Sequence, residues 1–262
     1  QAFQCRLPFL PMMRRSLLAC KIRPAASAAA SSAASGAQPP RLRQLTPGEL
    51  TGPQRQLYEA VAAGARDSTG KPLKTRVDPA DGSLLGPFNA MLLSPQVGQD
   101  LVRLADSLRF GDLGLPQRVA EAVILYVVRR YGAEYPFWSH MKIGRAAGLS
   151  EATIRSLQRR ELPAGLPEDE AAALALAEEL LEGEAAGRSG RGALSDASYA
   201  AAVQTLGERG VFEVVAITGF YTALSRIVNV FRVPVPEGER HPFEGEDEAR
   251  RPPPAGASSS RL

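Results

Sequence analysis

Between residues 45 and 236 the chain is a succession of apolar segments with helical spacing, separated by short breaks rich in Gly and Pro. Pro, Ser or Thr stands at the start of most segments, as is usual at the beginning of a helix. No segment alternates polar and apolar residues as a half-buried strand does. The sequence therefore predicts an all-α domain. The expected helices are 54–63, 95–108, 118–130, 136–148, 150–159, 167–181, 195–206 and 210–231, with one turn at 90–93 and a loop at 64–87.

Two of these segments set the expected core. Residues 118–130 are the most apolar, and their β-branched side chains would also suit a strand. A strand is usually about 5–6 residues long, and Pro116 before the segment with Arg129-Arg130 at its end favours a helix. The helix at 95–108 is expected to present one apolar face, made of Val97, Leu101, Leu104, Ala105 and Leu108.

The basic character of the chain is confined to its beginning. The first 48 residues hold seven of the 31 Lys and Arg residues and no acid, which leaves 24 basic against 28 acidic side chains in the rest. With Met12 or Met13 as initiator, a basic stretch at 14–23 followed by Ala and Ser is typical of a transit peptide. We predict that residues 1–44 are an organelle-targeting leader, disordered, and prefer a mitochondrial to a chloroplast destination. A plain disordered extension is the alternative.

The other end of the chain is also expected to be disordered. Residues 237–262 alternate clusters of charge with runs of Pro and Ser, so they bury little apolar surface. The predicted organisation is therefore a leader at 1–44, one helical domain at 45–236 and a tail at 237–262.

Several classes of function are excluded by composition. Both cysteines, Cys5 and Cys20, lie in the predicted leader, so the domain has no thiol for a disulfide, a thiolate metal site or redox catalysis. We predict no metal site and no cofactor. No membrane span is expected either, because no run of about 18 strongly apolar residues occurs. The basic pairs at 129–130 and 159–160 lie at helix ends without an aromatic platform, so nucleic acid is not an expected partner.

One constellation combines titratable groups with apolar surroundings. Glu121 lies in the most apolar helix, and His140, in the next helix, is the only histidine outside the predicted tail. If the two helices pack antiparallel, these side chains form a candidate acid/base pair. The alternative is a structural contact in which His140 or Arg118 satisfies a buried Glu121.

The same residues carry a resemblance to a known family. Glu121, residues 133–140 (AEYPFWSH) and residues 146–150 (AAGLS) resemble the carboxymuconolactone decarboxylase-like domain, which has the alkylhydroperoxidase D (AhpD) fold. Shorter matching pieces lie in order at 50–55, 86–89, 219–222 and 229–234, so the resemblance covers about residues 45–236. It implies an all-α, AhpD-like helical domain.

The peroxidase branch of that family works with a Glu, a Cys-x-x-Cys pair and a His. By spacing, the Glu and His fall on Glu121 and His140, and the two cysteines fall on Ala133 and Pro136. Peroxide chemistry of this kind needs a thiolate and a resolving thiol. Peroxidase activity is therefore the third and disfavoured hypothesis.

The decarboxylase branch needs no thiol. Loss of CO₂ from a small lactone or keto-acid leaves a dienolate that must be stabilised and protonated. The resemblance implies that His140 is the donor or acid and that Glu121 orients it. We expect Arg226 to bind a substrate carboxylate, with Tyr221 and Asn229 on the same general helix face as further substrate-binding residues. For these three, helix packing or capping is the alternative.

Two function classes thus remain open. The first is a carboxy-lyase or related enzyme that acts on a small molecule; the second is a catalytically silent family member that serves as an organelle scaffold or complex subunit. The resemblance also implies a homo-oligomer, a trimer or hexamer. The apolar residues 210–231 are compatible with a core position or a subunit interface.

Overall fold

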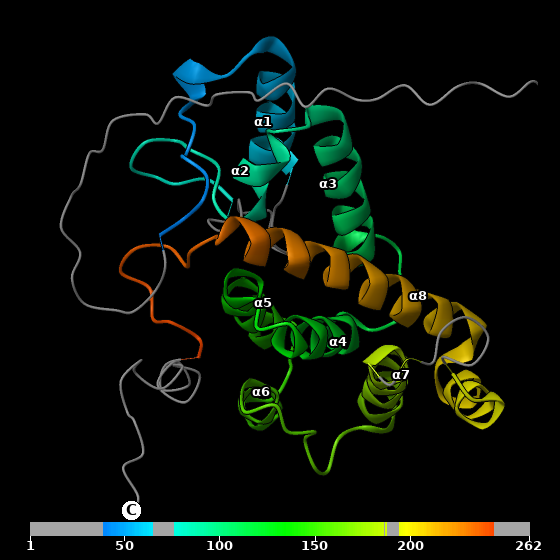
Figure 1. Cartoon of the computed structure of the whole chain (residues 1–262). Coiled ribbons are helices and arrows are strands. Elements are labelled where there is room, and N and C mark those ends of the chain that lie inside the picture. The colour runs from blue at the N-terminus through cyan, green and yellow to red at the C-terminus, as the bar shows by residue number, and fades with distance from the viewer. Residues whose placement is uncertain (1–38, 65–75, 186, 188–193, 244–262) are drawn as a thin grey trace, which may run out of the picture. The chain divides into compact units, whose positions relative to one another are not determined.

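The computed structural model describes residues 39–64, 76–185, 187 and 194–243 (Figure 1). Within them the secondary structure is helical, apart from an isolated bridge between Val77 and Leu84, so the predicted all-α class is confirmed. Most of the predicted leader and tail, residues 1–38 and 244–262, lies outside the described residues. The elements are η1 (Pro47–Glu49), α1 (Gly52–Gly64), α2 (Pro87–Met91), α3 (Pro95–Phe110), α4 (Gln117–Arg130), α5 (Glu134–Ala146), α6 (Glu151–Gln158), α7 (Glu168–Ala185) and α8 (Asp196–Phe231).

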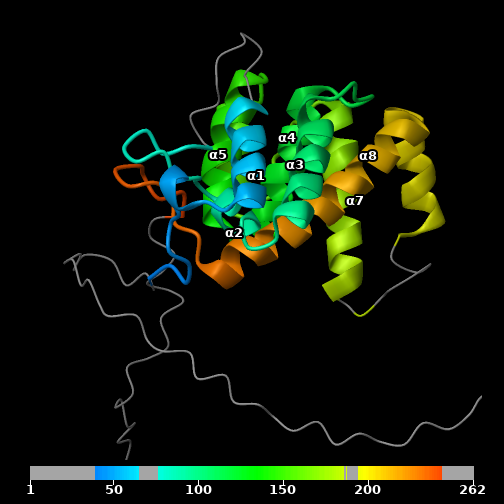
Figure 2. The same cartoon turned by 90° about the horizontal axis from the view of Figure 1, so that it is seen from above.

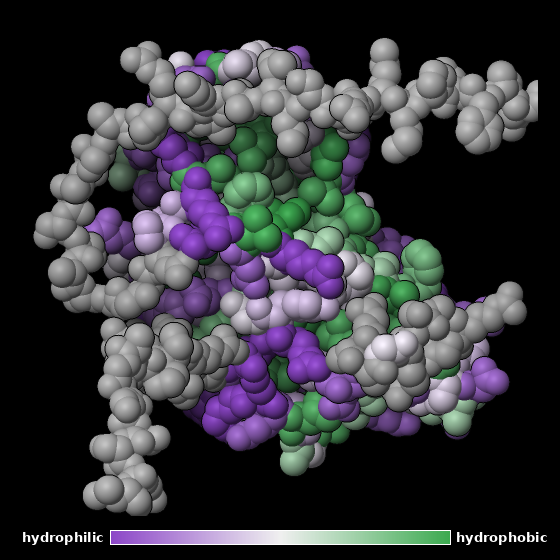
Figure 3. All heavy atoms as spheres, in the orientation of Figure 1, coloured by the Kyte–Doolittle hydropathy of each residue, from purple (hydrophilic) through white to green (hydrophobic). Residues whose placement is uncertain are grey.

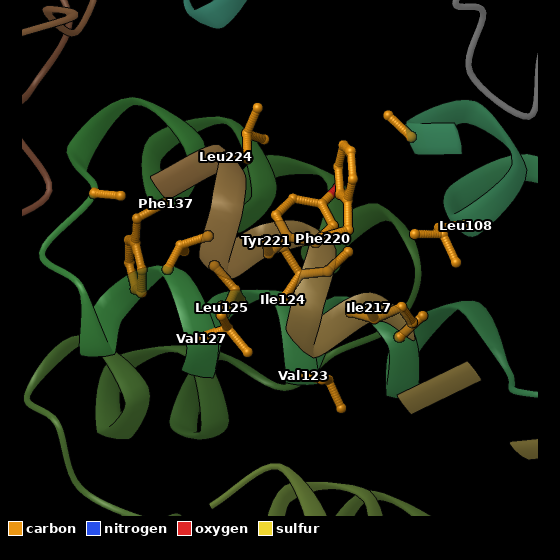
Figure 4. Packing of buried hydrophobic residues seen from close by; sticks show 14 of the residues in the cluster. Leu108, Val123, Ile124, Leu125, Val127, Phe137, Ile217, Phe220, Tyr221 and Leu224 are labelled. Atoms are coloured by element: carbon orange, nitrogen blue, oxygen red, sulfur yellow. The ribbon is translucent and has the colours of Figure 1, made fainter. Parts of the chain in front are cut away.

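The helix α4 is the centre of the domain. It contacts α5, α6, α7 and α8, and its apolar side chains from Val119 to Val128 are almost all fully buried. Figure 1 shows α8 running across the domain, with α1–α3 on one side and α4–α7 on the other; Figure 2 gives the same helices from above. Side chains from α3, α4, α5 and α8 meet in the main hydrophobic core (Figure 4).

The helix α8 contains a break at the position that the sequence predicted, between residues 206 and 210. Two helices were expected, 195–206 and 210–231, and the backbone leaves helical geometry at Gly207, with φ 69° and ψ 166°. Gly207 supplies the positive φ, which most residues avoid. By length and composition α8 is also long and apolar enough to cross a membrane, but 56% of its most apolar window is buried inside the fold, as in the core helix of a folded domain.

The helix α3 turns a different face inward from the one expected. Ala105 and Leu108 are buried, but Val97 and Leu104 are 56% and 45% exposed. Gly98 is the reason at the start of the helix, because its backbone packs so closely on Leu57 and Met91 that an added Cβ would lie 2.8 Å from both. Figure 3 shows hydrophobic surface over the region of α2 and α3. These outward apolar groups are compatible with the homo-oligomer, which stays a prediction.

The packed chain extends beyond the predicted end of the domain at Pro236. Phe243 is buried, and its ring centroid lies 5.0 Å from the ring centroid of Phe137. The Arg129 guanidinium lies 4.1 Å from the ring centroid of Phe243. Glu239 accepts hydrogen bonds from Trp138 Nε1 at 3.0 Å and Lys142 Nζ at 2.9 Å. The expectation of a disordered tail from residue 237 is therefore corrected for residues 237–243. The average composition of the segment predicted disorder because it does not register a single buried aromatic side chain, Phe243.

We expect Phe243→Ala to lower the free energy of unfolding by about 3 kcal/mol, the usual cost of truncating a buried Phe. Urea denaturation followed by circular dichroism measures it. Glu237→Ala, at an exposed position of the same segment, is the matched control and should change stability by less than about 0.5 kcal/mol. Equal stability of Phe243→Ala and the parent would show that this segment does not contribute to the core.

Candidate active site

Glu121 and His140 meet where α4 packs on α5. Oε2 of Glu121 lies 2.7 Å from Nδ1 of His140, and the two residues are 1% and 4% exposed. A tight turn at 131–133 joins the helices, with Gly132 at φ 61°. Gly144 of α5 lies at this helix contact, where an added Cβ would be 3.6 Å from Cβ of Glu121, an ordinary packing distance. The structure thus brings together the two residues that the sequence singled out, while Arg118 pairs with Asp169 and Glu170 instead.

Tyr221 of α8 extends this pair into a chain of three groups. An ionised carboxylate can only accept, so we assign the imidazole proton to Nδ1, which donates to Glu121. Nε2 is then an acceptor, and the Tyr221 hydroxyl, 3.2 Å away, donates to it. The two rings meet edge to face at 88°, with centroids 5.1 Å apart. Figure 4 shows Tyr221 among the packed side chains of the core, which holds its ring in place.

The surroundings keep two groups of this chain neutral, the imidazole of His140 and the phenol of Tyr221. Burial lowers the pKa of His140 below its ordinary value; Glu121 opposes this, and the positive charges of Arg109 and Arg76 add to it. Burial also raises the pKa of the Tyr221 hydroxyl. At neutral pH the site therefore contains a neutral imidazole whose Nε2 is basic and a phenol that retains its proton.

His140 and Tyr221 form part of the wall of a pocket of about 40 Å³. A cavity needs about 10–15 Å³ to hold a water molecule, so this space fits a group of the size of a carboxylate, and a larger substrate requires side chains of the wall to rotate. The lining residues are Arg76, Pro87, Phe88, Met91, Ala105, Arg109, Tyr135, Pro136, Ser139, His140, Phe220, Tyr221 and Leu224.

A larger hollow of about 340 Å³ lies beside α6 and the start of α7, away from this chain. Its charged lining residues, Arg118 and Glu170, already pair with each other at 2.6 Å. The smaller pocket, which contains His140 and Tyr221, is therefore the candidate active site.

Comparison with known proteins gives the fold a name. No family model and no curated protein matches the sequence. Among solved structures, the alkylhydroperoxidase AhpD core of an uncharacterized peroxidase-related protein from Ralstonia eutropha JMP134 is similar, with a TM-score of 0.59 at 17% identity, over 77% of this chain and 95% of that one. The chain has the AhpD-like fold. A protein of unknown function from Agrobacterium tumefaciens also matches, at 18% identity over 56% of this chain and 96% of that one, but at a TM-score of 0.49 we draw nothing from it.

In the described part of this AhpD-like domain, no thiol lies beside the Glu–His pair. Ala133 is fully buried at the end of the turn before α5, and Pro136 lines the pocket one turn before His140. These are the two positions at which the resemblance would place cysteines. Cys5 and Cys20 lie outside the described residues. Nor do the described residues contain a group of three His, Cys, Asp or Glu side chains that could hold a metal ion.

Two of the residues expected to bind substrate do not reach the pocket. Arg226 is exposed, and its guanidinium lies 5.9 Å from the ring centroid of Tyr131. Asn229 donates from Nδ2 to the carbonyl oxygen of Tyr131 at 2.8 Å, which is a structural contact. On an α-helix a residue five positions from Tyr221 is rotated by about 140°. Sequence spacing of five was therefore too wide to keep Arg226 on the pocket face.

Two other arginines take positions on the pocket wall that were not foreseen. Arg109 is in the last turn of α3, four residues after the buried Ala105, and so lies on the buried face of that helix. A cation at this spacing was the sequence feature that could have identified Arg109 as a site residue. Arg76 lies in the loop before α2, among residues expected only to be irregular. No sequence pattern marked it, because a loop brings distant residues together without a period.

The lowered pKa of His140 predicts a loss of stability in weak acid. The unfolded state binds the proton from about pH 6.5 downward, whereas the folded state does not until lower pH. Stability should therefore fall as the pH drops below about 6.5, by up to about 1.4 kcal/mol per pH unit from this group. Urea denaturation at pH 7.5 and 5.5 measures it, with His140→Gln as reference; an equal pH dependence in both proteins would contradict the prediction.

Proposed function

We propose that this protein is a thiol-independent acid/base enzyme, a carboxy-lyase that acts on a small lactone or keto-acid. The AhpD-like fold does not by itself carry this proposal, because function is set by the site and not by the fold. The observation that carries it is the buried hydrogen-bonded chain Glu121–His140–Tyr221, which ends on the wall of a pocket.

In the proposed reaction the bond between the substrate carbon and its carboxylate breaks. CO₂ leaves, and the electron pair stays on the carbon, delocalised as an enolate or dienolate. The Tyr221 hydroxyl, released from His140, donates a hydrogen bond to the enolate oxygen, where charge develops. Nε2 of His140 takes up a proton from a water molecule, whose hydroxide returns to the solvent, and delivers that proton to the carbon. Glu121 stabilises the transient imidazolium through Nδ1.

Each part of the site supports such a step. The carboxylate of Glu121 is 2.7 Å from Nδ1, so it fixes the ring and favours a proton at Nε2. The apolar side chains of Phe88, Met91 and Leu224 line the pocket beside the polar groups, and an apolar wall strengthens electrostatic interactions close to it. Tyr221 is held by packing in the core and already lines the pocket, so only its O–H bond has to turn from His140 to the substrate.

The proposal is tested by incubating the purified chain with carboxylated lactones, including carboxymuconolactone, and with short keto-acids such as oxaloacetate and acetoacetate. Release of CO₂ from at least one of them is expected. Because both cysteines are at positions 5 and 20, alkylation with iodoacetamide should leave the rate unchanged. A rate that requires an added thiol and disappears on alkylation would contradict the acid/base proposal.

The competing hypothesis is a non-catalytic scaffold or complex subunit. In that case the Glu121–His140 pair only joins α4 to α5, and no substrate is turned over by the parent protein. Persistent absence of turnover across the substrate series, together with recovery of the protein in a stable complex with other proteins of the organelle, would replace the enzyme proposal by this one.

A further inference from the structure

Arg76 and Arg109 reach the same pocket from different parts of the chain. They are 3% and 9% exposed, and both line the wall that contains His140. Nη1 of Arg76 and Nε of Arg109 are buried and have no hydrogen-bond partner among the residues that the structure describes. A buried guanidinium with an unused donor is costly unless something accepts from it.

The contacts that the two arginines do make leave these donors free. Nη2 of Arg76 donates to Asp106 at 2.5 Å, and the Arg76 guanidinium lies 5.0 Å from the ring centroid of Phe88. The Arg109 guanidinium lies 4.6 Å from the ring centroid of Phe110, and no ion pair among the described residues involves Arg109. A ring attracts the cation over its face and takes none of its N–H hydrogen bonds.

We propose that Arg76 and Arg109 form an anion subsite for a small carboxylate beside His140. The inference rests on the proposed function and deepens it by naming the charge of the substrate. Arginine presents paired donors in a plane, which matches the two oxygens of a carboxylate. The pocket volume of about 40 Å³ fits such a group. The carboxylate held here is one that the reaction keeps, because an ion pair stabilises a carboxylate relative to neutral CO₂.

Filling this subsite changes the proton affinity of His140. The charged and titratable groups around the imidazole are Glu121 of α4, Tyr221 of α8, Arg109 and Asp106 of α3, Tyr135 of its own helix and Arg76 of the loop. In the free protein burial is the main cause of the lowered pKa of His140, and the charges of the two arginines lower it further. A bound carboxylate neutralises them, so the pKa of His140 rises and a proton is taken up at Nε2. Binding of the anion therefore protonates His140, the general acid of the proposed reaction.

The chain is well suited to a direct measurement, because it contains only two histidines, His140 and His241. The full chain is titrated with acetate and with pyruvate at constant ionic strength, and the Cε1–H resonances of the two rings are followed by NMR at pH 6.5 and 7.5. The His140 resonance should move in a saturable manner toward its protonated position, and affinity should be higher at pH 6.5. His241, which contacts Glu134 outside the pocket, should not respond.

Substitutions locate the effect. Arg109→Gln should weaken carboxylate binding by at least about tenfold, and Arg109→Lys, which keeps the charge and loses the paired donors, should fall between it and the parent. Arg103→Gln, on the exposed side of the same helix with a side chain 68% exposed, should bind as the parent does. Thermal unfolding of each variant verifies that it is folded.

Three results would overturn the subsite: no saturable shift of His140, the same shift with chloride or inorganic phosphate at equal concentration, or unchanged affinity in folded Arg109→Gln. Binding is read without turnover, so the two proposals fail separately. A saturable shift without CO₂ release supports the anion subsite and contradicts the proposed lyase activity. CO₂ release without the shift supports the lyase activity and contradicts the subsite.

Discussion

We expect His140→Ala to lower kcat/KM for decarboxylation by about 100-fold to 10,000-fold, the usual contribution of a positioned general acid or base. The reason is that Nε2 is the only basic atom of the buried chain that faces the pocket; Tyr221 keeps its proton, and Glu121 lies behind the imidazole. The measurement is the initial rate of CO₂ release from the best substrate of the series, over a range of concentrations that separates kcat from KM.

The neighbouring groups give this prediction its controls. Glu121→Gln keeps the shape of the side chain but offers a neutral amide to Nδ1, so kcat should fall by less than in His140→Ala while KM changes little. Tyr221→Phe removes only the hydroxyl and should likewise lower kcat. His241→Ala, outside the pocket, should act as the parent does. A folded His140→Ala protein that turns over within twofold of the parent would remove the catalytic assignment.

The parts of the site that could be predicted are those whose positions follow from the helical spacing of apolar residues. Helical spacing and the Pro and Gly breaks placed α4 and α5 as neighbours in sequence, and a single buried carboxylate and a single imidazole on them left few pairings. Tyr221 also lines the pocket, since α8 is long and its inner face is set by its apolar residues. Periodicity thus determined which helix faces carry chemistry, although it did not determine every residue on them.

What could not be predicted depends on tertiary contacts without a period. Arg76 comes from a loop, and its place on the pocket follows from the hydrogen bond to Asp106 and the stacking on Phe88. Phe243 anchors a segment whose composition indicates disorder. Gly98 rotates the buried face of α3 through its close contacts with Leu57 and Met91. In each case one side chain, or the lack of one, outweighs the average character of its segment.

The second large effect is expected at Gly86, the residue before α2. Its backbone has φ 63° and ψ −142°, a conformation that residues with a Cβ scarcely adopt. An added Cβ would also lie 2.1 Å from Cε1 and 2.3 Å from Cζ of Tyr135, a buried ring on the pocket wall. The ring cannot withdraw easily, since it packs against Trp138 with centroids 5.4 Å apart. Gly86→Ala therefore combines backbone strain with a clash in the core.

We expect Gly86→Ala to lower the free energy of unfolding by at least about 4 kcal/mol, in the range reached when strain and overpacking act together. Urea denaturation measures it. Gly219→Ala is the control, because Gly219 is inside α8 with nothing within 4 Å of an added Cβ; it should be neutral or stabilise by about 0.5–1 kcal/mol. In a Tyr135→Leu background the clash is relieved and the strain remains, so Gly86→Ala should cost less there. A cost below about 1 kcal/mol in the parent would mean that the loop before α2 yields, and that the wall formed by Tyr135 is not fixed by Gly86.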